Sequence, residues 1–175
     1  MITDSYESSH ELYLALLKAI EWSKNPVTTP PSLLGDGLKT FSLTPFLFMA
    51  SAVSDYTLVN PSPQKIKKTS KGEDWSLTLS RNQDILQSLP QESLHRIGFK
   101  AETDASIAFT SAQNMLHEKN LQGVCLNILG TDTSFGDTEG ALTLILPTTT
   151  IPLPKLPKIS LTLTLLENLA ASGLS

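Results

Sequence analysis

The hydrophobic pattern begins with a helix. Ser8 stands three residues before Glu11, which is the spacing of a capping box, and apolar residues then recur at helical spacing, at Tyr13, Leu16, Leu17 and Ile20. This pattern predicts an amphipathic helix over roughly residues 9–22 that packs on a sheet. Residues 23–45 are rich in proline, threonine, glycine and serine, so we expect a long irregular loop there.

The strands are predicted by short apolar runs. Residues 46–53 are apolar over eight positions, which is typical of a strand buried on both faces of a parallel sheet. Residues 123–129 and 141–146 predict two more strands, and residues 96–99 a short one. The stretch WSLTLS alternates with period two, and the proline- and threonine-rich residues after 146 predict a link rather than a strand.

Further helices are expected between these strands. Asn82 is expected to cap a short helix that carries residues 84–89, and Thr103 or Asp104 a longer one that runs to Lys119. The stretch LTLLENLAA predicts a helix near the C-terminus. Alternation of strands and helices predicts an α/β fold with a doubly wound, mostly parallel sheet, which binds ligands at the carboxyl ends of its strands.

Composition narrows the class. The 175 residues carry 17 acidic and 13 basic side chains, a net charge of −4, which fits one domain and argues against bulk nucleic-acid binding. Apolar residues make up 40% and charged residues 17%, so the chain can fold around a core. Cys125 is the single cysteine, so no internal disulfide can form and a reducing cytoplasm is the expected compartment. Cys125 itself is expected to pack in a strand. We expect neither a signal peptide nor a membrane span.

The first candidate for ligand chemistry follows the strand at 46–53. Met49, Ala50 and Ser51 lead into Asp55, and small residues at a strand end let the backbone come close to a ligand. Asp55 is suited to bind a hydroxyl or a hydrated metal, and the alternative is an ordinary turn aspartate.

A second candidate is a lysine run. Lys65, Lys67, Lys68 and Lys71 lie within seven residues of an otherwise acidic chain. On an extended backbone Lys65 and Lys67 share a face, where one can meet a phosphate while the other stays solvated. The alternative is a solvated surface.

Three more candidates lie at other ends of elements. The stretch Asn82, Gln83, Asp84, Ile85 and Leu86 opens a helix whose free N–H groups suit an anion or a carbonyl edge, and the alternative is a plain cap. Phe99 follows a glycine at a strand end and offers a platform for a base or ribose. Lys119 ends a helix, where it alternatively complements the helix dipole.

Taken together, the order and spacing of these motifs resemble phosphopantothenate–cysteine ligase, the ligase half of the bifunctional coenzyme A biosynthesis flavoprotein of bacteria. The shared pattern is ASAVSDY, then KIKK beginning ten residues after Asp55, then NQDIL, GFKAET, and KNL before VCLN and Phe135. It covers about residues 8–135 and extends more loosely to the last helix. KIKK with its flanking motifs is fairly specific, whereas GFxAET alone is weak.

The resemblance implies a fold and a reaction. The fold would be Rossmann-like with a flap and dimerisation arm over residues 57–81, and the protein would be a homodimer. CTP and Mg²⁺ would convert the carboxylate of 4′-phosphopantothenate into an acyl-cytidylate, from which cysteine displaces CMP to form an amide. An FMN-containing phosphopantothenoylcysteine decarboxylase is a candidate partner domain.

The resemblance also implies roles for individual residues. Lys65 matches the essential lysine of the flap, and Asp55 the nucleotide or metal aspartate, with the metal ligands otherwise unknown. The remaining matches are nucleotide-binding positions, namely Met49, Ala50, Ser51, Gln83, Asp84, Ile85, Leu86, Phe99 and Lys119.

This chain departs from the family pattern in several places. It shows no glycine-rich strand-to-helix turn and no matching asparagine segment, so we expect the domain to be incomplete at its N-terminus. Met115 stands where lysine is usual, Gln83 where proline is usual, and Gln122 where aspartate is usual.

Three other function classes are alternatives to this ligase. A noncatalytic nucleotide-binding or dimerisation module of the same fold is the runner-up. An NAD-linked oxidoreductase and a triad hydrolase are disfavoured, because the chain has neither GxGxxG after a strand nor GxSxG.

Overall fold

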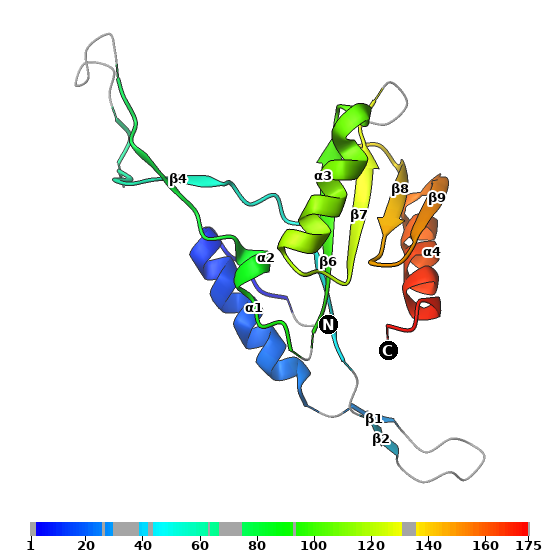
Figure 1. Ribbon diagram of the computed structural model, residues 1–175. Coiled ribbons are helices and arrows are strands. Elements are labelled where there is room, and N and C mark those ends of the chain that lie inside the picture. Colours follow the sequence, from blue (N-terminus) through cyan, green and yellow to red (C-terminus); the bar gives the residue numbers. More distant parts are fainter. Residues whose placement is uncertain are drawn as a thin grey trace.

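A five-stranded sheet forms the centre of the computed structural model, which describes residues 3–25, 27–29, 39–41, 44–62, 64–66, 75–92, 94–130 and 136–174. Its strands, in spatial order, are β3 (Phe46–Met49), β6 (His95–Glu102), β7 (Gly123–Ile128), β8 (Glu139–Ile145) and β9 (Thr150–Pro157) (Figure 1). β3, β6 and β7 are parallel, whereas β8 and β9 are added antiparallel. The predicted α/β fold with a parallel sheet core is confirmed.

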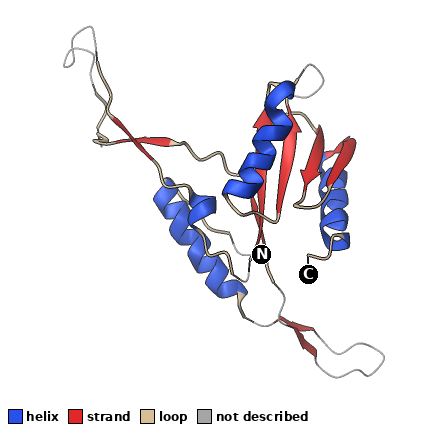
Figure 2. Cartoon of the chain, viewed as in Figure 1, coloured by secondary structure: helices blue, strands red, loops and turns tan. Residues whose placement is uncertain are grey.

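Helices cover both faces of this sheet (Figure 2). α1 (Ser9–Ser23), α2 (Ile85–Ser88) and α3 (Ala105–Glu118) lie on one face, and α4 (Lys158–Ala171) lies on the other. Because strand side chains alternate, neighbouring residues of β7 enter different cores: Val124 packs with α3 and Cys125 with α4. No helix in the described part of the chain is long and apolar enough to cross a bilayer.

α1 begins as the sequence predicts. The Ser8 hydroxyl accepts from the Glu11 N–H, and the Glu11 carboxylate accepts from the Ser8 N–H, which completes the capping box. The Glu11 carboxylate accepts hydrogen bonds from the backbone N–H groups of Glu7 and Ser8, and these bonds hold its pKa below the ordinary value. The buried side chains Leu12 and Ile20 share a core cluster with Ile85, Leu89 and Leu94, and Leu47 and Met49 of β3 pack against this cluster.

Two expectations about the strands are wrong. β3 is a four-residue, half-buried strand and not an eight-residue strand buried on both faces, because within the described residues it pairs only with β6. The chain leaves the ladder at Ala50, whose N–H turns back to the Phe48 carbonyl. β9 forms where a link was expected. Its prolines are tolerated because β9 is an edge strand, where a missing N–H breaks no inner ladder.

Smaller differences concern lengths and caps. β6 extends over eight residues where residues 96–99 were expected. Asp84, and not Asn82, caps α2, and Asp104 caps α3. The segment predicted to be an irregular loop contains an antiparallel pair, β1 (Val27–Thr29) with β2 (Lys39–Phe41).

An arm extends away from the body of the molecule (Figure 1). β4 (Tyr56–Leu58) and β5 (Leu79–Arg81) pair antiparallel to form it. β5 contains the end of the alternating WSLTLS stretch. The arm leaves large apolar side chains exposed, at Tyr56, Leu58, Trp75, Leu77 and Leu79.

Candidate functional site

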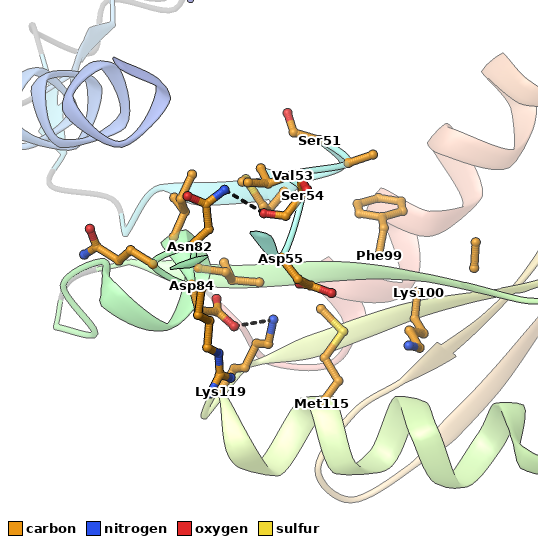
Figure 3. Close-up of a pocket in the computed structure, with 17 residues that line it drawn as sticks. Ser51, Val53, Ser54, Asp55, Asn82, Asp84, Phe99, Lys100, Met115 and Lys119 are labelled. Carbon is orange, nitrogen blue, oxygen red and sulfur yellow. Dashed lines mark hydrogen bonds and ion pairs between the residues drawn. The ribbon is translucent and has the colours of Figure 1, made fainter. Parts of the chain in front are cut away.

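A cavity of about 470 Å³ lies at the carboxyl ends of β3 and β6. Its walls come from residues 51–55 after β3, residues 81–86 before and within α2, residues 99–101 at the end of β6, and the last turns of α3 (Figure 3). In open α/β sheets this is the edge at which ligands bind, because the loops that follow parallel strands meet there. The cavity is therefore the candidate functional site.

Most of the residues expected at a nucleotide site line this cavity. Of the eleven residues expected, Ala50 and Lys65 are not among the lining residues. Lys65 is exposed and lies beyond β4, on the arm. The nine residues that line the cavity are Met49, Ser51, Asp55, Gln83, Asp84, Ile85, Leu86, Phe99 and Lys119.

Other predicted residues fall outside the described residues, and one is buried in the core. Lys67, Lys68, Lys71 and Phe135 lie outside the described ranges. Cys125 is fully buried, and this burial raises the pKa of its thiol to about 12, so the expectation that it packs is confirmed.

Asn82 joins two walls of the cavity. Its side-chain amide donates to the Ser54 carbonyl at 2.8 Å, and its backbone N–H donates to the Asp55 carbonyl at 2.8 Å. These bonds fix the residues after β3 against those that lead into α2. Within the described residues, the Asp55 carboxylate itself has no hydrogen-bond partner, so it is available to a ligand.

An ion pair in the cavity joins the N-cap of α2 to the C-cap of α3. The Lys119 Nζ lies 2.7 Å from Asp84 Oδ2, and Asp84 Oδ1 accepts from the Gln87 N–H at 3.0 Å (Figure 3). Partial burial by itself would raise the pKa of Asp84, but the hydrogen bonds from Lys119 and Gln87 outweigh it and hold that pKa below its ordinary value. Lys119 caps the C-terminus of α3, so it also complements the helix dipole there.

Met115 lines the floor of the cavity and packs against Gly98 of β6. A Cβ at Gly98 would lie 2.6 Å from Met115 Cε and 2.9 Å from Leu121 Cδ1, so a larger residue there would force the tips of both side chains to shift. Met115 thus places an apolar side chain in the cavity where the family pattern has lysine.

Sequence reasoning missed several polar lining residues. Arg81 and Lys100 add positive charge at the cavity, where Lys100 also pairs with Glu102 at 3.0 Å. Asn82 belongs to the 82–86 stretch expected to meet a ligand, and it lines the cavity. A signal for Arg81 is present in the sequence, because Arg81 directly precedes that stretch.

The acidic side chains fit a metal only if a ligand completes its shell. The described residues contain no group of three or more His, Cys, Asp or Glu side chains that could hold a metal ion. Mg²⁺ commonly binds one or two carboxylates and completes its coordination with water and substrate phosphates. Asp55 fits that arrangement, whereas Asp84 is already engaged with Lys119.

The fold and the cavity define a doubly wound α/β ligand-binding domain with a polar site at the carboxyl ends of its parallel strands. The family model described as "DNA/pantothenate metabolism flavoprotein C-terminal domain" matches residues 16–172. The chain therefore belongs to this family.

Two curated relatives of this chain have the same name. The chain is 29% identical over 123 residues to the coenzyme A biosynthesis bifunctional protein CoaBC of Vibrio vulnificus (strain YJ016), a match that covers 68% of this chain and 30% of that protein. It is 35% identical over 97 residues to the protein of the same name from Haemophilus influenzae, covering 54% and 23%. The matches thus span less than a third of each relative.

Solved structures support the fold. The crystal structure of the C-terminal domain of CoaBC has a TM-score of 0.63 at 20% identity and covers 95% of this chain and 63% of that one. The DNA/pantothenate metabolism flavoprotein from Streptococcus pneumoniae has a TM-score of 0.60 at 17% identity, covering 95% and 69%.

Proposed function

We propose that this chain is the nucleotide-binding part of a CTP-dependent phosphopantothenate–cysteine ligase of coenzyme A biosynthesis. The observation that carries the proposal is the convergence of nine of the eleven expected residues on one cavity at the carboxyl ends of β3 and β6. Membership of the pantothenate flavoprotein family supports the same substrate class.

The reaction has two steps. The carboxylate of 4′-phosphopantothenate attacks the α-phosphorus of CTP, the bond to the β-phosphate breaks, and pyrophosphate leaves. The amine of cysteine then attacks the acyl carbon of the acyl-cytidylate, loses a proton and displaces CMP, which forms the amide. The protein must bring two anions together and neutralise the triphosphate, because a carboxylate becomes an electrophile only once it carries a good leaving group.

Different cavity residues are assigned to the triphosphate, to the ribose and base, and to Mg²⁺. Lys119 and Arg81 supply positive charge for the triphosphate from two different walls. Phe99 offers an aromatic face for the ribose or base, and residues 83–86 offer backbone groups for the base edge. Bound Mg²⁺ would neutralise phosphate charge, and Asp55 is the carboxylate that would hold it together with the phosphates.

Lys65 is assigned to the charge that develops in the transition state. It lies on the arm and outside the cavity, so it must approach the nucleotide through arm movement or from a second copy of the chain. A flap lysine of this kind acts on the reaction rate more than on nucleotide affinity.

The arm, residues 57–81, is also proposed as the dimerisation element. It exposes large apolar side chains, and within the described residues β4 and β5 pair only with each other, which favours pairing with a second copy around a two-fold axis. Light scattering at micromolar concentration should report a homodimer, and a monomer would contradict this assignment.

The proposed reaction takes place in the cytoplasm, where the buried thiol of Cys125 stays reduced. Its product carries the cysteine carboxylate, which is the group that an FMN-containing decarboxylase would remove. The relatives' name, a bifunctional protein of coenzyme A biosynthesis, supports such a partner domain.

The two steps can be tested separately. The chain is incubated with CTP, Mg²⁺ and 4′-phosphopantothenate without cysteine, and pyrophosphate is measured by a coupled assay and acyl-cytidylate by mass spectrometry. We expect both products, followed by CMP and amide when cysteine is added. Saturable CTP binding without pyrophosphate release would instead identify a noncatalytic nucleotide-binding module.

A further inference from the structure

Arg96 of β6 is a charged residue whose side chain is buried in the core. It is the only buried charged side chain within the described part of the molecule, with an exposed fraction of 0%. Its Nη1 donates to the Leu86 carbonyl at 3.1 Å and its Nη2 to the Asn120 carbonyl at 2.5 Å. No carboxylate among the described residues pairs with it, and its Nε has no hydrogen-bond partner.

The sequence explains why the Leu86 carbonyl needs an outside donor. In α2 the Ser88 N–H donates to the Asp84 carbonyl and the Leu89 N–H to the Ile85 carbonyl. The next donor in this series would be residue 90, which is proline and has no N–H. The Arg96 guanidinium takes the place of that missing donor and fixes α2 directly beside its cap, Asp84.

The second carbonyl that the Arg96 guanidinium binds belongs to Asn120, in the turn that ends α3. Asn120 has φ of 49°, and the N–H groups of Asn120 and Leu121 donate to the carbonyls of His117 and Leu116. This is the Schellman arrangement that ends a helix, and it places Lys119 as the C-cap of α3. The Asn120 carbonyl therefore belongs to the residue next to Lys119, and Arg96 fixes it.

We propose that Arg96 is a positioning residue of the cavity: by holding the Leu86 and Asn120 carbonyls, it keeps Asp84 and Lys119 in contact at 2.7 Å. Burying a guanidinium without a carboxylate is costly, and an apolar side chain of similar volume often stabilises a core as well or better. Alignment of two backbone segments explains why a charge occupies this place. The effect on nucleotide affinity rests on the proposed function, whereas the effect on Asp84 does not.

The alignment can be measured without any nucleotide. The pKa of the Asp84 carboxyl is followed by ¹³C NMR in the intact chain and in the variants Arg96→Met and Arg96→Lys. We expect the pKa of Asp84 to rise toward its ordinary value in both variants, because one ammonium cannot bridge two carbonyls. Arg81→Met is the matched control, since Arg81 acts on Asp84 through charge alone and shows the size of that effect.

Two results would overturn the proposal. One is a pKa of Asp84 in Arg96→Met that stays at the value of the intact chain. The other is an Arg96→Lys variant that keeps that value, because charge alone would then suffice. If Arg96→Met does not fold, the Arg96→Lys titration decides the question, and circular dichroism shows whether each variant has kept its fold.

Calorimetric titration with CTP and Mg²⁺ adds the functional consequence. We expect both Arg96 variants to bind CTP more weakly, by about tenfold to a hundredfold, which is the scale for losing a hydrogen bond to a charged group. Unchanged CTP affinity in a variant with a raised Asp84 pKa would overturn the role in binding. If the intact chain does not bind CTP, the proposed function fails, and the Asp84 titration still decides whether Arg96 aligns the pair.

Discussion

The cavity and the arm hold their functional residues in opposite ways. Asn82 and Asp84 in the cavity, and Arg96 in the core behind it, each join two backbone segments through hydrogen bonds or an ion pair. On the arm, β4 and β5 pair over three residues, their side chains are exposed, and Lys65 lies beyond this ladder. The cavity is therefore preorganised to bind, whereas the arm needs movement or a partner before Lys65 can act.

The largest effect is expected on the arm. Lys65→Gln should lower amide formation by roughly 10²–10³, the cost of losing one preorganised donor in a transition state. CTP affinity should stay within about threefold, because Lys65 lies outside the cavity. Turnover is measured by amide formation and affinity by calorimetry.

The control for this change lies two residues away. Lys67→Gln removes the same charge from the lysine run and should lose far less turnover. Equal losses in both variants would show that the run acts as a diffuse positive patch, and the catalytic assignment of Lys65 would be dropped.

The next effect is expected in the cavity. Lys119→Met removes a cation and releases Asp84, so CTP affinity should fall by about tenfold to a hundredfold, the range of a charge-assisted hydrogen bond. Lys18→Met, an exposed lysine on α1, is the control and should bind as the intact chain does. A Lys119→Met variant with unchanged CTP affinity would contradict the assignment of nucleotide binding to the cavity.

The ion pair also predicts a response to acid. The pKa of folded Asp84 lies below its ordinary value of 3.8, so the pair stabilises the fold above that pH. This contribution is lost as the pH falls through the folded-state pKa. Thermal unfolding between pH 5 and 2 should therefore show a smaller acid-induced loss in Asp84→Asn than in the intact chain. Equal acid sensitivity of both proteins would contradict a stabilising ion pair between Asp84 and Lys119.

The smallest effect is expected at the cavity floor. Gly98→Ala places a methyl group against the tip of Met115, which can shift, and against Leu121, so we expect a loss of about 1 kcal/mol in the free energy of unfolding. In a Met115→Ala background the same change should cost less, because one of the two contacts is gone. Urea unfolding measures both, and an equal cost in both backgrounds would exclude Met115 as the obstacle.

Local signals predicted much of the fold. The capping box of α1 and the Asp104 cap of α3 depend on residues a few positions apart, so the sequence alone was sufficient to predict both helices. β9 was missed because its prolines exclude an inner strand, and its edge position is a property of the whole sheet. β3 was predicted too long because burial on both faces needs a neighbour on each side.

The candidate site likewise contains residues that the sequence predicts and one that it does not. Asp55, Phe99 and Lys119 were expected from motif spacing, and the structure brings them to one cavity. Arg96 was not expected, because its contacts depend on the absent N–H of Pro90 and on the left-handed turn at Asn120. Those residues lie 6 and 24 positions away from Arg96 along the chain, so no local pattern joins them.

The most direct measurement of the central claim is calorimetric titration of the chain with CTP and Mg²⁺. The cavity account predicts saturable binding, and it predicts that Asp55→Ala weakens this binding by about tenfold or more, as for loss of an interaction with a charged group. Asp55 is suited for this test because its carboxylate lines the cavity and has no partner among the described residues. Binding that is absent, or equally tight in Asp55→Ala, would contradict a nucleotide site at the carboxyl ends of β3 and β6.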